Sequence, residues 1–209
     1  MTSNSEVKRI GIMGGTFDPL HYGHLVAAEM ARNEFRLEKV IFIPTGNPPH
    51  KMGREITNPE ARFQMVKLAT EDNLSFGVSR IEIERIGHSY TVDTLRELHQ
   101  LYPEHEIYFI TGSDAFREIF TWKDFESALE LCHFIGASRP GFDAEEFMQD
   151  LQAAHPEFFT RMHLLEVPAL AISSTDIRSR VRKNQPIRYL LPEAVRLYIE
   201  RESLYQNIL

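Results

Sequence analysis

Short apolar runs alternate with longer amphipathic segments along most of the chain, and the two patterns predict different elements. Runs of about four mostly apolar residues are typical of buried strands, while apolar residues three and four positions apart are typical of helices. The predicted strands are residues 10–13, 40–43, 107–110, 134–137 and 164–167. The predicted helices are residues 25–35, 59–70, 92–102, 125–131 and 144–154. Strands that alternate with helices favour an α/β fold with a doubly wound parallel sheet and helices on both faces.

Two further segments complete this outline. Residues 75–84 are expected to form another strand, because Ile81 and Ile83 alternate with polar neighbours. Residues 173–209 are expected to form two helices. We therefore expect one domain over residues 1–209, with residues 173–209 as its C-terminal helical segment.

The composition is that of an ordinary globular protein. Of 209 residues, 43% are hydrophobic and 25% are charged, and 23 basic against 30 acidic residues give a formal net charge of −7. This acidic balance does not favour nucleic acid as a partner. Cys132 is the one cysteine, so no internal disulfide can form, and its apolar neighbours favour a buried thiol. Without a signal-peptide core or an apolar run of membrane-spanning length, we expect a cytoplasmic protein with no membrane partner.

A glycine turn over residues 14–24 joins a predicted strand to a predicted helix. Gly14 and Gly15 let the backbone approach a ligand closely, and the free N–H groups at the start of a helix suit an anion. His21 and His24 are three positions apart at the start of that helix, so both can face one anion. The sequence therefore predicts a site for nucleotide phosphates at the carboxyl ends of the strands, although two better known glycine fingerprints for nucleotides are absent.

Two loops carry residues that suit a second substrate. His50 and Lys51 could reach an anionic group from the end of a strand, or belong to a solvated surface loop. Ser89 or Thr91 is expected to cap the helix that follows, and the same helix start could bind a substrate carboxylate.

Two later segments add candidate ligands for a nucleotide. Asp114 could bind a ribose or cap a helix, and Trp122 could stack on an aromatic ring or belong to the core. Ser174, Thr175 and Arg178 lie at the start of a predicted helix, where hydroxyls, backbone N–H groups and a guanidinium suit a phosphate. The alternative for this segment is an ordinary capped helix with an exposed arginine.

The stretch Gly-Gly-Thr-Phe-Asp-Pro followed by His-x-Gly-His resembles the signature of the nucleotidyltransferase superfamily. Further segments, in the same order along the chain, resemble one family within it, the bacterial nicotinate-nucleotide adenylyltransferases. These segments are residues 47–51, 89–95, 112–114 and 172–178, together with Trp122. The resemblance implies a Rossmann-like fold and transfer of AMP from ATP to nicotinate mononucleotide, which gives deamido-NAD and pyrophosphate in NAD biosynthesis.

The resemblance also implies a role for each matching residue. The implied catalytic residues are His21, His24 and Arg178. The implied ATP-binding residues are Gly14, Gly15, Thr16, Phe17, Gly112, Asp114, Ser174 and Thr175. The implied residues for nicotinate mononucleotide are His50, Lys51, Tyr90, Thr91 and Trp122. Magnesium is expected to arrive with ATP, held chiefly by phosphates and water, with no metal site made by the protein.

Three alternatives stay open at this point. The acceptor could be another phosphate of the superfamily, such as phosphopantetheine or a choline- or glycerol-type phosphate. The protein could be a nucleotide sensor without activity, although His21, His24 and Arg178 together speak against it. The histidine pair could bind a transition metal, but the motif offers no third ligand. A homo-oligomer is compatible with the sequence.

Overall fold

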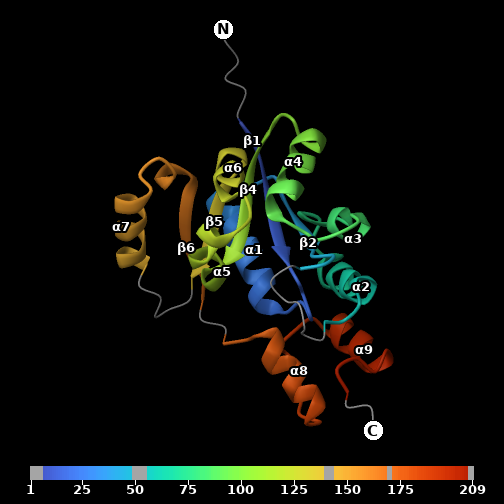
Figure 1. Cartoon of the computed structure of the whole chain (residues 1–209). Helices are drawn as coiled ribbons and strands as arrows, with labels where there is room; N and C mark the ends of the chain where they lie inside the picture. Colours follow the sequence, from blue (N-terminus) through green and yellow to red (C-terminus); the bar gives the residue numbers. More distant parts are fainter. Residues whose placement is uncertain (1–6, 49–55, 139–143, 169–170, 207–209) are drawn as a thin grey trace.

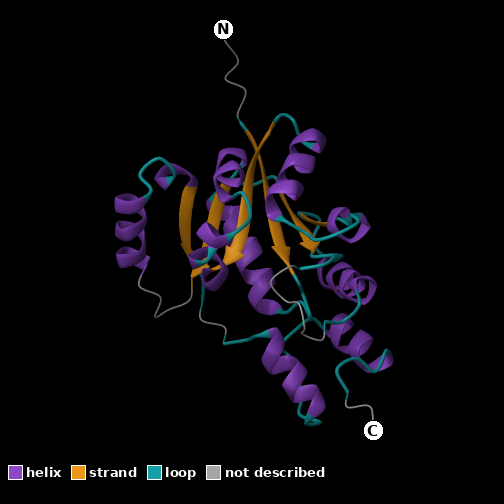
Figure 2. Cartoon of the chain, in the orientation of Figure 1, coloured by secondary structure: helices purple, strands orange, loops and turns teal. Residues whose placement is uncertain are grey.

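Six parallel strands form the centre of the molecule. The computed structural model describes residues 7–48, 56–138, 144–168 and 171–206. Within these ranges the sheet has the order β3-β2-β1-β4-β5-β6, and its strands all run towards one edge (Figure 2). The strands are β1 (Lys8–Gly15), β2 (Lys39–Pro44), β3 (Phe76–Val78), β4 (His105–Gly112), β5 (His133–Ser138) and β6 (Met162–Glu166). This is the strand order of a Rossmann fold, so the predicted fold class is confirmed.

The helices of the described residues connect these strands, and the last two follow β6. They are α1 (Tyr22–Glu34), α2 (Pro59–Thr70), α3 (Ile81–Glu84), α4 (Thr91–Leu101), α5 (Ser113–Arg117), α6 (Phe125–Leu131), α7 (Ala144–Ala154), α8 (Ser174–Arg182) and α9 (Glu193–Arg201), with short 3-10 helices η2 (Ile119–Thr121) and η3 (Phe159–Arg161). Each of the predicted helices is present. The apolar pattern does not predict α5, η2 or η3, which are too short to show a helical period. In the described ranges, no helix combines the length and the apolar character needed to cross a membrane.

Buried side chains alternate between the two faces of the sheet. On β2, Val40 and Phe42 pack with α1 and α2, whereas Ile41 and Ile43 pack on the opposite face with α4. Helices α8 and α9 add apolar side chains to the first of these clusters. Both helices lie beyond the carboxyl ends of the strands in Figure 1, so they border the edge where the glycine turn is found.

The predicted strand over residues 75–84 is largely wrong. Only β3 pairs with the sheet, and α3 holds both isoleucines of the alternating pattern. The chain turns at Arg80, whose carbonyl oxygen accepts the N–H groups of Ile83 and Glu84. Glu82 is buried, and its carboxylate accepts the hydroxyl of Thr94 at 2.8 Å. The polar position of the pattern therefore faces inwards, which a strand with isoleucines inside would not allow.

The sequence predicts a hydroxyl cap for both α4 and α8, and the structure confirms it only at α8. At α4, the cap residue is Tyr90, and its side chain makes no cap hydrogen bond. Ser89 instead accepts the backbone N–H of Asn47 at 3.2 Å, so the expected capping role of Ser89 or Thr91 is wrong. At α8, the hydroxyl of Ser173 accepts the N–H of Asp176 at 3.1 Å, as expected for a helix opened by a hydroxyl residue.

Two histidines pair near the amino ends of the strands, away from the glycine turn. His133 Nδ1 and His163 Nε2 are 3.0 Å apart, and the Tyr108 ring stacks on His133 with centroids 4.7 Å apart. Such a bond needs one neutral ring nitrogen as its acceptor. Burial, followed by the neighbouring His133, lowers the pKa of His163 from 6.5 to about 4.

We expect this pair to make the protein less stable in mild acid. Because the folded state has the lower pKa, the unfolded chain binds the extra proton between pH 6.5 and about 4, and stability falls as the pH falls through this window. The loss should be on the order of 2 kcal/mol in the free energy of unfolding. Urea unfolding of wild type and His163→Gln at several pH values measures it. The exposed His88 offers a matched control, His88→Gln, and an equal pH dependence of stability in wild type and His163→Gln would contradict the expectation.

Candidate active site

The glycine turn lies at the carboxyl end of β1, where the strand order reverses between β1 and β4. Ligands of open α/β sheets bind at this kind of switch point. A Cβ at Gly14 would lie 2.6 Å from Phe109 Cζ, so a larger residue does not fit there. Phe17 has φ 49° and its side chain is buried at 3% exposure. Contact of Phe17 with a ligand would therefore come from its backbone.

The two histidines of the motif stack on each other at the start of α1. Their ring centroids are 3.8 Å apart, and the planes are inclined by 27°. The backbone N–H of His21 donates to His24 Nδ1 at 3.2 Å. Because Nδ1 accepts this bond, the neutral His24 ring carries its proton on Nε2, which makes Nε2–H a donor. The Phe17 ring meets His24 edge to face at 5.2 Å and fixes the plane of that ring.

The start of α8 packs directly on the glycine turn. The Ser174 hydroxyl donates to the carbonyl oxygen of Pro19 at 2.9 Å. Arg178 Nη1 donates to the carbonyl oxygen of Asp18 at 2.6 Å, and Nη2 donates to the Thr175 hydroxyl at 3.3 Å. Arg178 is half-buried. The alternative of an exposed surface arginine is therefore wrong, and hydroxyls and guanidinium lie beside the histidine helix.

A second group of predicted residues lies near the start of α4. The backbones of Asn47 and Ser89 are joined by an N–H···O bond of 3.0 Å, which holds the loop after β2 against this helix start. Lys123 Nζ lies 4.1 Å from the centre of the Tyr90 ring. Trp122 is partly buried and meets Phe109 and Phe134 edge to face, in each case at 6.1 Å.

The aromatic side chains of this group have a core-facing side and a side towards solvent. Trp122 and Tyr90 both pack against the buried cluster on the α4 face of the sheet, and neither is fully buried. The core and stacking interpretations of Trp122 are therefore compatible. Thr91 is the first residue of α4.

For the other predicted residues, the structure gives a position in the backbone or no description. Gly112 ends β4 and precedes α5, which contains Asp114, so both positions lie at the same edge of the sheet as the glycine turn. His50 and Lys51 lie outside the residues that the structure describes.

Three residues that the sequence interpretation did not select hold this edge together. Asp18 is buried, and its carboxylate accepts the Tyr205 hydroxyl at 2.7 Å and the Thr57 N–H at 3.3 Å. Arg62 is 1% exposed and donates to three backbone carbonyl oxygens. Burial, and then the Asp18 charge, raises the pKa of Tyr205, so its hydroxyl stays a donor. A buried arginine in an amphipathic helix gives no sequence signal of its own, because the same residue type normally marks the exposed face.

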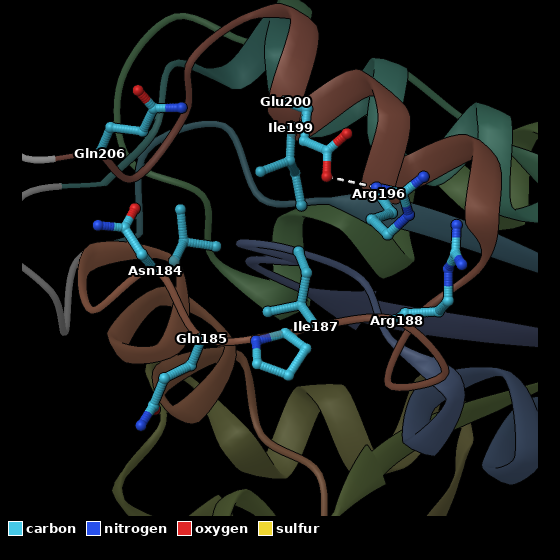
Figure 3. A pocket seen from close by; sticks show the side chains of 10 residues that line it. Asn184, Gln185, Ile187, Arg188, Arg196, Ile199, Glu200 and Gln206 are labelled. Carbon is cyan, nitrogen blue, oxygen red and sulfur yellow. Dashed lines mark hydrogen bonds and ion pairs between the residues drawn. The ribbon is translucent and has the colours of Figure 1, made fainter.

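A pocket of about 460 Å³ lies elsewhere, among the C-terminal helices (Figure 3). Its walls combine apolar side chains with amides and charges from α8, α9 and the segments that follow each of them. Arg196 is bonded to Glu193 and Glu200, so its charge is compensated locally. None of the predicted site residues that the structure describes line this pocket.

Comparison with known proteins agrees with the geometry of the glycine turn. The family model described as cytidylyltransferase-like matches residues 12–180. A relative from Desulfitobacterium hafniense (strain Y51), named "Probable nicotinate-nucleotide adenylyltransferase", is 70% identical over 99% of this chain and 100% of its own length. The chain belongs to the nicotinate-nucleotide adenylyltransferase family. A family member from Moorella thermoacetica is 58% identical over 95% of this chain and 92% of its own length.

A solved structure shares the fold of this chain. Plasmodium falciparum nicotinic acid mononucleotide adenylyltransferase complexed with NaAD superposes with a TM-score of 0.77, over 95% of this chain and 97% of that chain. The two sequences are 23% identical, so this likeness supports the fold alone.

Proposed function

We propose that the protein transfers AMP from ATP to nicotinate mononucleotide, forming nicotinate adenine dinucleotide and pyrophosphate in NAD biosynthesis. The observation that carries the proposal is the contact of Arg178 and Ser174 with the turn that bears His21 and His24, in a chain 70% identical to a named family member. This contact gathers donors suited to a polyphosphate at the switch point of the sheet.

The chemistry needs alignment and charge neutralisation more than proton transfer. A phosphate oxygen of nicotinate mononucleotide attacks the α-phosphorus of ATP, a new P–O bond forms, and the bond to the β-phosphate oxygen breaks to release pyrophosphate. The attacking monoester has a second pKa of about 6, so it is largely dianionic at neutral pH and needs no general base. The site must therefore hold two anions in line and stabilise negative charge at the α-phosphate.

The predicted catalytic and ATP-binding residues each have a role in this scheme. His24 Nε2–H donates to the α-phosphate in the transition state, because its Nδ1 already accepts the His21 N–H. His21 and the backbone of Gly14 to Phe17 hold the same phosphates. Ser174, Thr175 and Arg178 bind the β- and γ-phosphates and the departing pyrophosphate. Gly112 and Asp114 contact the nucleoside.

Magnesium is expected to enter with ATP and to neutralise phosphate charge. In the described parts of the chain, no three histidine, cysteine or carboxylate side chains gather to hold a metal ion. The carboxylate of Asp18, in the glycine turn, already accepts two hydrogen bonds from the protein. The hydrogen-bond donors around Asp18 suit a magnesium ion that is held chiefly by phosphates and water.

We also propose a cytoplasmic location, since the reaction consumes ATP. We propose no nucleic-acid partner. A homo-oligomer is compatible with the structure.

Pyrophosphate release tests the proposed function. Wild-type protein with ATP and magnesium should release pyrophosphate on addition of nicotinate mononucleotide. It should release little with phosphopantetheine, choline phosphate or glycerol phosphate as acceptor, or with CTP in place of ATP. Turnover with one of those acceptors and none with nicotinate mononucleotide would contradict the assignment of substrate.

We expect the protein to prefer the acid over the amide form of the acceptor. The helix start at Tyr90 and Thr91 offers N–H and hydroxyl donors, which suit a carboxylate, whereas the amide N–H₂ group would meet other donors. A mismatch of polar groups in a closed site can lower kcat/KM by about 10⁴-fold. Parallel assays with nicotinate and nicotinamide mononucleotide measure the ratio. Equal efficiency with both would refute the carboxylate site and leave adenylyl transfer intact.

Trp122→Ala tests the aromatic side of the acceptor site. Loss of a stacking partner worth about 1 kcal/mol should raise KM for nicotinate mononucleotide by roughly fivefold and leave KM for ATP unchanged. Phe120→Ala is the matched control, because Phe120 is also partly buried but its ring packs on Phe125 and His155. An equal change in both substrate KM values would contradict the assignment of Trp122.

A further inference from the structure

Arg62 is a buried cation whose hydrogen bonds to the described residues go to backbone carbonyl oxygens. It extends from the first turn of α2 and is 1% exposed. Nε donates to Thr57 O at 2.8 Å, Nη1 donates to Thr16 O at 2.9 Å, and Nη2 donates to Gly46 O at 3.3 Å. One guanidinium thus joins three segments of the chain.

These three carbonyl groups lie at the functional edge of the sheet. Thr16 follows β1 in the glycine turn that is proposed to hold ATP. Gly46 follows β2, next to Asn47, which pairs with the start of α4 on the acceptor side. Thr57 lies just before α2. Arg62 therefore links the turn after β1 to the segment after β2.

The position of Gly46 is also limited from the opposite side. A Cβ at Gly46 would lie 2.0 Å from the carbonyl oxygen of Glu82 in α3. The Gly46 backbone is therefore confined between Arg62 and α3, and a shift of the guanidinium would move this loop.

The charge of Arg62 is compensated by two buried acids without a direct ion pair. Burial lowers its pKa, while the charges of Asp18 and Glu82 oppose that effect. The carboxylate oxygens of both acids are bonded elsewhere, to Tyr205 and Thr57 and to Thr94. Burying a cation in this way is costly, and an apolar residue would often be as stable or more stable. The planar fork with several donors instead suits a role that needs three acceptors held in fixed directions.

We propose that Arg62 is a positioning residue for adenylyl transfer, because it holds the ATP-side turn at Thr16 and the acceptor-side loop at Gly46 at the separation that in-line attack requires. The inference rests on the proposed function. It assigns to Arg62 no contact with either substrate. Its removal should therefore affect the alignment of bound substrates more than their binding.

Arg62→Lys tests this role, since it keeps the charge and loses the fork. We expect kcat to fall by about 100-fold, as for a misplacement of about 1 Å, with both KM values within about threefold of wild type. Arg9→Lys is the matched control, because Arg9 is a partly buried arginine on β1 that bonds Glu106 at 3.1 Å at the opposite end of that strand. Thermal unfolding of both variants and calorimetric titration with ATP alone accompany the kinetics.

The outcomes separate the inference from the proposed function. No wild-type turnover with ATP and nicotinate mononucleotide would contradict the proposed function and, with it, the inference. An active wild type with unchanged kcat in folded Arg62→Lys would overturn only the role of Arg62, as would a loss confined to KM or an equal loss in Arg9→Lys. If Arg62→Lys does not fold, Gly46→Ala displaces the same loop with the guanidinium intact. Its kcat should also fall, and an unchanged kcat in folded Gly46→Ala would overturn the proposal.

Discussion

Replacement of His24 by alanine is expected to lower kcat by about 100- to 1,000-fold, the usual loss for one donor to charge that develops in a transition state. A hydrogen bond sets the tautomer of His24. Its Nδ1 accepts the backbone N–H of His21, so its Nε2 carries the proton that a phosphate oxygen can accept. KM for ATP should change much less than kcat, because the bond is strongest in the transition state. Steady-state pyrophosphate release with both substrates saturating measures the effect.

Two controls accompany this variant. Because His24 also packs against the Phe17 ring, thermal unfolding must show that the His24→Ala protein is folded. His105→Ala removes a histidine at the amino end of β4, the opposite end of the sheet from the glycine turn, and should leave kcat unchanged. Near-normal turnover in a folded His24→Ala protein would disprove the catalytic role. His21→Ala is expected to lose turnover as well and to bind ATP more weakly.

The second large effect is expected at Arg178. Arg178→Lys keeps the charge but cannot bond the Asp18 carbonyl and the Thr175 hydroxyl together, as the guanidinium does. We expect kcat/KM for ATP to fall by about 10- to 100-fold, which corresponds to a charge-assisted hydrogen bond of about 1.5–3 kcal/mol. A titration of rate against ATP concentration at saturating nicotinate mononucleotide gives this value.

Helix α8 contains its own control for this experiment. Arg180 lies two positions further on and bonds Asp176 at 2.7 Å within the same helix. Arg180→Lys should therefore leave kcat/KM for ATP within about twofold of wild type, as is usual for a surface ion pair. If kcat/KM for ATP is unchanged in Arg178→Lys, the wild-type guanidinium has a structural role at the Asp18 carbonyl and does not bind ATP.

Local patterns in the sequence predict the sheet and most helices because those elements depend on local periodicity. The residues of β2 show this well, since Val40 to Ile43 are apolar on both faces and the strand is covered on both faces. The same reasoning fails at Ile81 and Ile83, because a four-residue helix and a short strand give the same alternation. The buried Glu82 between them is stabilised by Thr94, a partner that local sequence cannot indicate.

In the candidate site as well, local motifs are predictable from the sequence and contacts between distant segments are not. The histidine motif is local, so its place at a strand–turn–helix junction is predictable. Arg62 contacts Thr16, 46 positions away, and its burial depends on loops that meet only in the folded protein. Ser89 looks like a helix cap from its neighbours, but its hydroxyl accepts the N–H of Asn47, 42 positions away. Contacts of this kind are a property of topology, and a periodic pattern carries no information about them.

The bonds around Asp18 and Pro19 also set an order of events during synthesis. Ser174, Arg178 and Tyr205 reach this turn from 155, 160 and 187 positions along the chain. On the ribosome, the segment that holds β1 to β6 emerges before any of these three partners. A nascent chain can therefore pair its strands while the glycine turn still lacks its hydrogen bonds to Ser174, Arg178 and Tyr205. The candidate active site is therefore complete only after α8, α9 and Tyr205 have been synthesised.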